Sequence, residues 1–239
     1  MKKLVSIVLV LVGLSGGYLW LTQVENDVTE QDVTAIAEAL QLNPLETYDF
    51  SEMSFEEQID FIEHVQDAVL GNVPVNSGIP HGLPREPQDL LEVGEGLCFD
   101  RSRFIEKALR QHGFETRHIA IYSTAETQSA FKSLLTPQVS SHAVTEVLTS
   151  RGWLVVDSNE RWISLDYGFQ PVSIVELSEM GKAGMMERLV AQPEIPIYAG
   201  DFTFVYGLYS RHGMFYPPYD RVPDINIPEF AQNVSRLFY

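Results

Sequence analysis

The residues around the only cysteine of this 239-residue chain constrain its fold more than any other feature. Cys98 follows the turn-forming segment Gly94-Glu95-Gly96-Leu97, and an amphipathic stretch runs on from it to Gly113. This pattern predicts a helix over about 97–112 with the sulfur in its first turn, where backbone N–H groups lack partners within the helix. We expect the apolar residues Leu97, Phe104, Ile105, Ala108 and Leu109 to face inward, and the basic residues Arg101, Arg103, Lys107 and Arg110 to face out.

Two strands after this helix carry a histidine and an aspartate. Strand 142–148 begins at His142, strand 153–157 ends at Asp157, and the turn residues between them predict a hairpin. Such a hairpin sets His142 opposite Asp157 or within two residues of it, and opposed residues share a face with Cβ atoms about 4.5–5.5 Å apart. Asn159 is an alternative third residue if the register slips.

This order of residues is typical of nucleophilic catalysis by a thiol. A cysteine attacks only as thiolate, and a helix start and a neighbouring imidazolium both lower the pKa of a thiol from its free value of about 8.5. Taken alone, Cys98 would more often be a buried and inert thiol. Together the three residues predict Cys98 as nucleophile, His142 as base and Asp157 as the group that orients the imidazole.

The N-terminus carries a membrane signal. Lys2 and Lys3 precede 18 uncharged residues, which predicts a transmembrane anchor over residues 1–23. Ser15-Gly16-Gly17 is a weak cleavage candidate, so a cleaved signal peptide is the alternative. No Lys or Arg follows until Arg85, which predicts that the bulk of the chain lies outside the cytoplasm.

Charge and cysteine content exclude several classes of function. The formal net charge of −17 predicts that the chain binds neither nucleic acid nor anionic lipid. One cysteine cannot form a disulfide within the chain or a thiolate metal cage. The sequence has no H-x-x-x-H pair, phosphate-binding loop or dinucleotide fingerprint, so we expect no metal and no cofactor.

The rest of the chain divides into segments of different composition. Residues 24–71 predict an acidic helical segment packed on the core, with one helix over 29–41 and a second that opens on the capping box Ser54-Phe55-Glu56-Glu57 and closes at Gly71. Residues 72–239 form the main domain, which ends in an aromatic and proline-rich extension that either wraps over the body or lines the far end of the cleft. Its expected parts are a loop over 72–96 that walls the cleft, a strand over 118–122, a polar loop over 123–140 and a short strand over 161–165.

Three motifs in this order resemble the transglutaminase-like superfamily. They are Gly96-Leu97-Cys98 with the helix that runs into 109–118, Ser141-His142-Ala143-Val144, and Gly152–Asp157, which together span roughly residues 90–165. The resemblance implies an α+β, papain-like core in which a nucleophile helix packs on an antiparallel sheet, with Cys98, His142 and Asp157 in the catalytic roles. Departures are Val144 where tryptophan is usual, and Phe99-Asp100 where small residues are common. Asn76 and Gln88 are the candidates for a side-chain oxyanion donor.

The expected function is therefore a membrane-anchored, extracytoplasmic thiol enzyme that cleaves or transfers an amide or acyl group. Its substrate would be a protein, a peptide or a glycan-linked acyl group near the membrane. One alternative is a catalytically silent scaffold of the same fold in envelope or surface-polysaccharide assembly. Another is acyl transfer from a carrier thioester, which the same three residues could perform.

Overall fold

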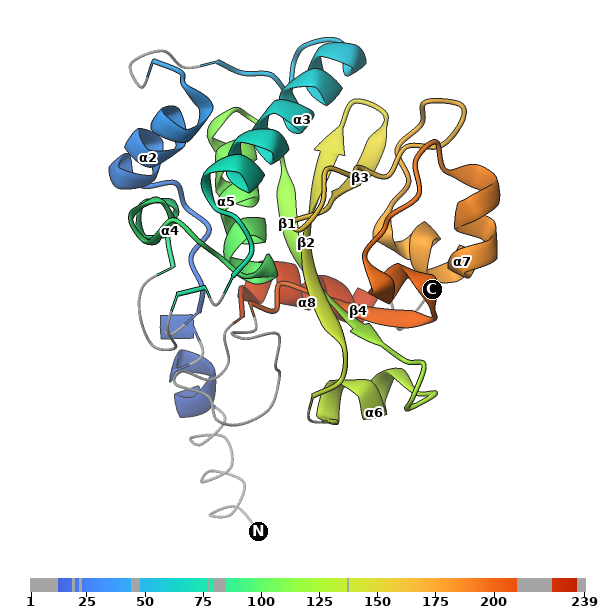
Figure 1. The fold of residues 1–239 in the computed structure, drawn as a ribbon. Helices are drawn as coiled ribbons and strands as arrows, with labels where there is room; N and C mark the ends of the chain where they lie inside the picture. Colours follow the sequence, from blue (N-terminus) through green and yellow to red (C-terminus); the bar gives the residue numbers. More distant parts are fainter. Residues whose placement is uncertain are drawn as a thin grey trace.

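The computed structural model describes residues 13–235 apart from 19, 22, 44–47, 77, 80–84, 137 and 210–224. A four-stranded antiparallel sheet in the order β3-β2-β1-β4 lies at its centre (Figure 1). Helices α2, α3, α4 and α5 lie on one side of this sheet and α7 lies on the other. The mixed α+β class and the antiparallel sheet predicted from the sequence are confirmed.

The first two helices of the core begin where their capping residues predict. The side chain of Thr29 caps α2 (Glu30–Leu40), and that of Ser54 caps α3 (Phe55–Asn72). In each case the acidic residue three positions on returns a bond to the cap backbone, which satisfies two N–H groups at each helix start. Gly71 does not close α3, because the helix continues through Asn72.

Helix α5 (Cys98–Gln111) forms the centre of the molecule and carries the cysteine at its first position. The apolar side chains of Phe104, Ile105, Ala108 and Leu109 are buried in the cluster shared by α2, α3 and the sheet. At the helix start, Asp100 accepts a hydrogen bond from the backbone N–H of Leu97 at 3.0 Å. Gly78 lies against this turn with a φ of +71°, and a Cβ there would come within 2.9 Å of the Asp100 carboxylate.

The predicted outward direction of the basic residues on α5 is wrong for three of the four. Arg101, Arg103 and Lys107 are buried, and only Arg110 keeps a partly exposed side chain. Surrounding segments cover α5 and supply anionic partners: Lys107 pairs with Asp32 of α2 at 2.7 Å, and Arg103 pairs with Glu86 at 2.8 Å. The amphipathic pattern could not reveal these partners because they lie far away along the chain.

The strands follow the predicted hairpin closely. Strand β1 (Thr116–Ser123) pairs with β2 (Ser141–Thr149), and β2 pairs with β3 (Gly152–Val156) across a tight turn. The register sets Thr145 opposite Val156 and Thr149 opposite Gly152. Alternate residues pack against α5 on one face and against the α7 side on the other, so the sheet separates two hydrophobic clusters.

Several elements were not predicted. A short helix α4 (Pro87–Val93) lies inside the expected loop 72–96, and α6 (Ala130–Leu135) lies inside the expected loop 123–140. Residues 161–165 make only isolated bridges. The remaining unpredicted elements are α7 (Ile174–Arg188), the 3₁₀ turn η1 (Pro196–Ala199), β4 (Phe202–Tyr206) and α8 (Ile227–Ser235). Helix α7 contains Gly181 at a φ of 58°, which interrupts its helical geometry and weakens any periodic signal.

Both ends of the described chain meet beside β4. The N–H of Val24 donates to the carbonyl oxygen of Ile225 at 2.8 Å, and Ile225 forms a bridge with Leu208. In the described ranges, no helix combines the length and apolar composition that a membrane crossing requires. Residues 1–12 of the predicted anchor lie outside the described residues.

Candidate functional site

Cys98 lies where the sheet edge meets the start of α5. It is the first residue of that helix, and its side chain is partly exposed. The first bond within the helix runs from the N–H of Arg101 to the carbonyl oxygen of Leu97 at 3.1 Å. The sulfur therefore lies at the positive end of the α5 dipole, which favours negative charge there.

His142 and Asp157 come together across the β2–β3 ladder. Extending the register from Thr145 and Val156 sets Asp157 opposite Val144, on the same face as His142 and one diagonal step from it. The Nε2 atom of His142 lies 2.8 Å from Oδ2 of Asp157. Both side chains are buried, with exposed fractions of 4% and 0%. Since Nε2 bonds the carboxylate, Nδ1 is the nitrogen left to interact with Cys98, which hydrogen-bonds the ring.

The Asp157 carboxylate is held on both oxygens. Oδ1 accepts from the backbone N–H groups of Asn159 and Glu160, at 2.7 and 3.1 Å. Oδ2 accepts from His142 and from the hydroxyl of Tyr198 at 3.0 Å. Asn159, the alternative third residue, instead accepts through its side chain from Arg101.

Charge is concentrated at this buried pair. Burial alone would lower the pKa of His142, but the charge and hydrogen bond of Asp157, followed by the interactions with Cys98, raise it to about 10. Burial would raise the pKa of Asp157, but the neighbouring imidazolium and the donors around the carboxylate lower it. At neutral pH the histidine is therefore a cation and the aspartate an anion.

Arg101 adds a second buried cation that the sequence analysis placed on the surface. Burial lowers the pKa of its guanidinium to about 10, while the charges of Cys98, Asp157 and Asp100 oppose that shift. It is therefore still charged at pH 7. Its position three residues after Cys98 on a central helix is the signal that could have identified it, because that turn of the helix faces the same corner.

Tyr198 is the other residue that the sequence analysis missed. Its side chain is 2% exposed, and its ring meets that of His142 edge to face at a centroid distance of 6.3 Å. The ring of Trp162 packs against it at 5.2 Å. Tyr198 belongs to η1, outside the three motifs, so no local pattern marks it.

A narrow pocket of about 10 Å³ opens beside the sulfur. Such a volume has room for one water-sized group. Neither Asn76 nor Gln88, the candidate oxyanion donors, lines this pocket. Asn76 donates to Glu95, and Gln88 donates to Gln31. The pocket is lined by Cys98, Phe99, His118, Ala120, Tyr122, Ser141, His142, Ala143 and Leu208.

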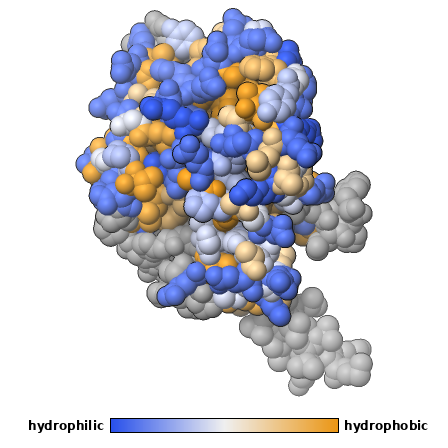
Figure 2. Space-filling model, turned by 45° about the vertical axis from the view of Figure 1, so that its right-hand side comes forward, coloured by the Kyte–Doolittle hydropathy of each residue, from blue (hydrophilic) through white to orange (hydrophobic). Residues whose placement is uncertain are grey.

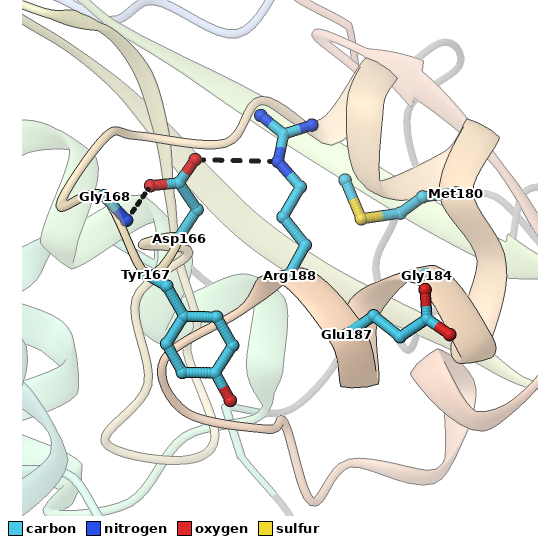
Figure 3. Close-up of a pocket in the computed structure, with 7 residues that line it drawn as sticks. All are labelled: Asp166, Tyr167, Gly168, Met180, Gly184, Glu187 and Arg188. Atoms are coloured by element: carbon cyan, nitrogen blue, oxygen red, sulfur yellow. Dashed lines mark hydrogen bonds and ion pairs between the residues drawn. The ribbon is translucent and has the colours of Figure 1, made fainter.

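A larger hollow of about 470 Å³ lies on the α7 side and contains none of the three predicted catalytic residues (Figure 3). Two of its charged residues pair, since Nε of Arg188 lies 3.6 Å from Asp166, and the same guanidinium bonds Glu176 outside the hollow at 3.0 Å. The face in Figure 2 is mostly hydrophilic, with hydrophobic side chains in small groups. Within the described ranges, no group of three or more His, Cys, Asp or Glu residues is placed to hold a metal ion.

Comparison with known proteins identifies the core of the chain. Residues 52–158 match the sequence model of the Transglutaminase-like superfamily. No curated protein matches the chain.

Two solved structures are similar to this chain. One is a candidate cysteine protease from Cytophaga hutchinsonii, with 14% identity and a TM-score of 0.38, where the match covers 74% of this chain and 48% of that one. The other is a candidate protease from Parabacteroides distasonis, with 11% identity and a TM-score of 0.33, where the match covers 54% of this chain and 26% of that one. This chain thus spans about half the length of the first and about a quarter of the second.

Proposed function

Residues 52–158 have the transglutaminase-like fold, a fold of thiol enzymes, and from this premise we propose that the chain cleaves or transfers an amide or acyl group with Cys98 as nucleophile. The single observation that supports the proposal best is the buried ion pair of His142 and Asp157 beside a partly exposed sulfur at a helix start. A histidine that is buried only for stability would not need the ion pair with a carboxylate, the partly exposed sulfur and the helix start together.

In the proposed reaction the Cys98 thiolate attacks the carbonyl carbon of the substrate. The C–S bond forms as the carbonyl π electrons move to oxygen, and the oxyanion is stabilised by backbone N–H groups at the start of α5. As the intermediate collapses, the C–N bond breaks, and the imidazolium of His142 gives its proton to the leaving amine. An acyl-enzyme remains on the sulfur.

The second half of the reaction returns the enzyme to its starting state. Neutral His142 removes a proton from water or an amine, which attacks the thioester and expels the Cys98 thiolate. The proton stays on His142 and restores the imidazolium. Asp157 stabilises that cation and fixes the ring, and Tyr198 is proposed as a positioning residue that fixes the carboxylate.

We further propose an extracytoplasmic position, with the N-terminal segment as the membrane anchor and a protein, peptide or glycan-linked acyl group near the membrane as substrate. The uncharged stretch after Lys3 and the acidic residues that follow it support this orientation. Hydrolysis is favoured over transfer to an amine because nothing in the sequence marks a dedicated amine site.

Thiol alkylation tests the proposal without a known substrate. At pH 6 a free thiol with a pKa of about 8.5 is almost entirely protonated and reacts slowly with iodoacetamide. We expect Cys98 to react at least about tenfold faster than glutathione at this pH, and the advantage to disappear in His142→Ala. Intact-mass spectrometry after incubation with peptide or thioester donors should then detect an acyl adduct that Cys98→Ala lacks.

The silent scaffold is the alternative that this experiment separates. An alkylation rate no higher than that of glutathione, together with an unchanged cellular phenotype in Cys98→Ala, would exclude the enzyme. The fold would then serve binding alone. A thioester donor that alone acylates Cys98 would instead identify transfer from a carrier.

A further inference from the structure

A second histidine lines the pocket beside Cys98 and has no place in the reaction proposed above. His118 lies in the middle of β1 and is completely buried, with an exposed fraction of 0%. Its ring stacks on that of Tyr209 at a centroid distance of 4.1 Å, which fixes the plane in which its nitrogens point. Its Nε2 atom has no hydrogen-bond partner among the described residues.

The hydrogen bonds around His118 determine which of its nitrogens carries the proton. The hydroxyl of Thr145 donates to the backbone carbonyl oxygen of Ser102 at 2.8 Å, which uses its only hydrogen. The Ser102 hydroxyl lies 3.0 Å from the Thr145 oxygen and 3.1 Å from Nδ1 of His118. All three contacts are hydrogen bonds only if Ser102 donates to Thr145 and Nδ1–H donates to Ser102. Nε2 is then an unprotonated acceptor.

His118 also stays neutral at physiological pH. Burial lowers its pKa to about 3, and the nearby guanidinium of Arg103 adds to that shift. The one carboxylate bonded at this position, that of Glu229, accepts from the backbone N–H of His118 and not from the ring. On the His118 side the pocket therefore presents a neutral acceptor, in contrast to the cationic ring of His142.

An acceptor left unpaired in a buried position destabilises the fold, so a ligand that pairs with it gains affinity. Apart from the histidines and Cys98, the walls are formed by Tyr122 and Ser141, which carry hydroxyls, and by the apolar Phe99, Ala120, Ala143 and Leu208. A group that fits must be about the size of a water molecule and must carry an N–H or O–H.

We propose that this pocket is a subsite for one hydrogen-bond donor on the acyl group, an N–H or O–H beside the reacting carbonyl that pairs with Nε2 of His118. The inference rests on the proposed function and deepens it, because it names the acyl class. Peptidyl and hydroxyacyl groups carry such a donor, whereas a simple alkyl acyl chain does not. The subsite therefore selects peptidyl and hydroxyacyl groups and disfavours simple alkyl acyl chains.

Two alkylating agents of almost the same shape test this subsite. 2-Chloroacetamide and chloroacetone differ in an NH₂ or CH₃ group beside the carbonyl, so only the first can donate to Nε2. The rate of each agent with Cys98 is divided by its rate with glutathione. The normalised rate of chloroacetamide divided by that of chloroacetone is the selectivity ratio. We expect a ratio of about five in favour of chloroacetamide, as one hydrogen bond supplies. His118→Phe, which keeps a ring but has no acceptor, should reduce the ratio to about one.

The matched control is His64→Phe, a histidine on α3 outside the pocket, which should keep the wild-type ratio. A wild-type ratio of about one, or a ratio that survives in His118→Phe, overturns the subsite. Because His118→Phe could fail to fold, ¹⁵N-histidine spectra of the wild-type protein provide a second test, in which the ring that stays neutral to pH 5 must carry its proton on Nδ1. A proton on Nε2 overturns the subsite. The proposed function fails separately, if neither agent alkylates Cys98 faster than glutathione at pH 6.

Discussion

His118 and His142 lie on neighbouring strands, line the same small pocket beside Cys98 and are both buried, yet His142 is a cation and His118 is neutral. The pKa of His142 is raised to about 10 and that of His118 is lowered to about 3. Burial lowers the pKa of both rings. The difference comes from the partner, since His142 bonds the carboxylate of Asp157, whereas His118 bonds the hydroxyl of Ser102.

Burial alone therefore does not decide whether a histidine in this fold is charged. One buried anion is enough to turn an acceptor into a proton donor. In the proposed reaction the two strands supply one sulfur with a mobile proton from His142 and a fixed neutral acceptor on His118. Each of the following experiments changes one side of this contrast.

The largest effect is expected from removing the anion. In Asp157→Asn the burial of His142 is opposed only by the weaker interactions with Cys98, so the pKa of His142 should fall well below 10 and its ring should lose most of its charge. We expect acyl transfer to fall by about 10³-fold, since the ring loses its charge and its preferred orientation. Turnover together with ¹⁵N-histidine titration measures both effects. A ring that still titrates near 10 in this variant would show that Asp157 is not the source of the charge.

The pH dependence of stability should have opposite signs for the two histidines. The folded pKa of His142 lies above its ordinary value of 6.5, so its stabilisation is complete below pH 6.5 and is lost as the pH rises toward 10. The folded pKa of His118 lies below 6.5, so its contribution is complete above pH 6.5 and is lost as the pH falls toward 3. Each change should be on the order of 5 kcal/mol in the free energy of unfolding.

Denaturant titrations across the pH range can separate these two contributions. His142→Gln should flatten the alkaline slope and leave the acid slope, whereas His118→Phe should do the reverse. If each variant removed the slope expected of the other, the assignment of charges to the two rings would be wrong.

The smallest effect concerns the two tyrosines that accompany the histidines. Tyr198 donates to Asp157, and Tyr209, stacked on His118, donates to Glu106 at 2.7 Å. Tyr198→Phe should lower kcat by about three- to tenfold with little change in KM and should shift the pH profile, because the carboxylate that orients His142 loses one donor. Tyr209→Phe should cost about 1–2 kcal/mol of stability and leave the pH profile of turnover unchanged. Equal pH profiles for the two variants would assign both hydroxyls to stability alone.

Local patterns were enough to predict the parts of the molecule that local interactions build. The caps at Thr29 and Ser54, helix α5 and the β2–β3 hairpin all follow from residues close in sequence. The meeting of His142 with Asp157 could be anticipated because a hairpin turn fixes its own register.

Other features depend on contacts that no local pattern encodes. Tyr198 reaches Asp157 from 41 positions away, and Lys107 is buried where Asp32 of α2 and Glu86 pair with it. The acceptor role of His118 depends on the hydroxyls of Ser102 and Thr145, which come from a helix and a neighbouring strand. The sequence predicted only a strand that begins at His118, because the chemistry of this residue arises in the folded chain.

The short bridge from Val24 through Ile225 to Leu208 has a mechanical consequence. Tension applied to the chain ahead of Val24 passes through Ile225 to Leu208, one of the residues that line the pocket beside the sulfur. Helix α5 also receives that tension, because the Arg103 guanidinium bonds the carbonyl oxygen of Glu25 at 2.8 Å and the side chain of Asn26 at 3.4 Å. A pull on the N-terminal segment would therefore act both on the Leu208 side of the pocket and on the helix that carries Cys98.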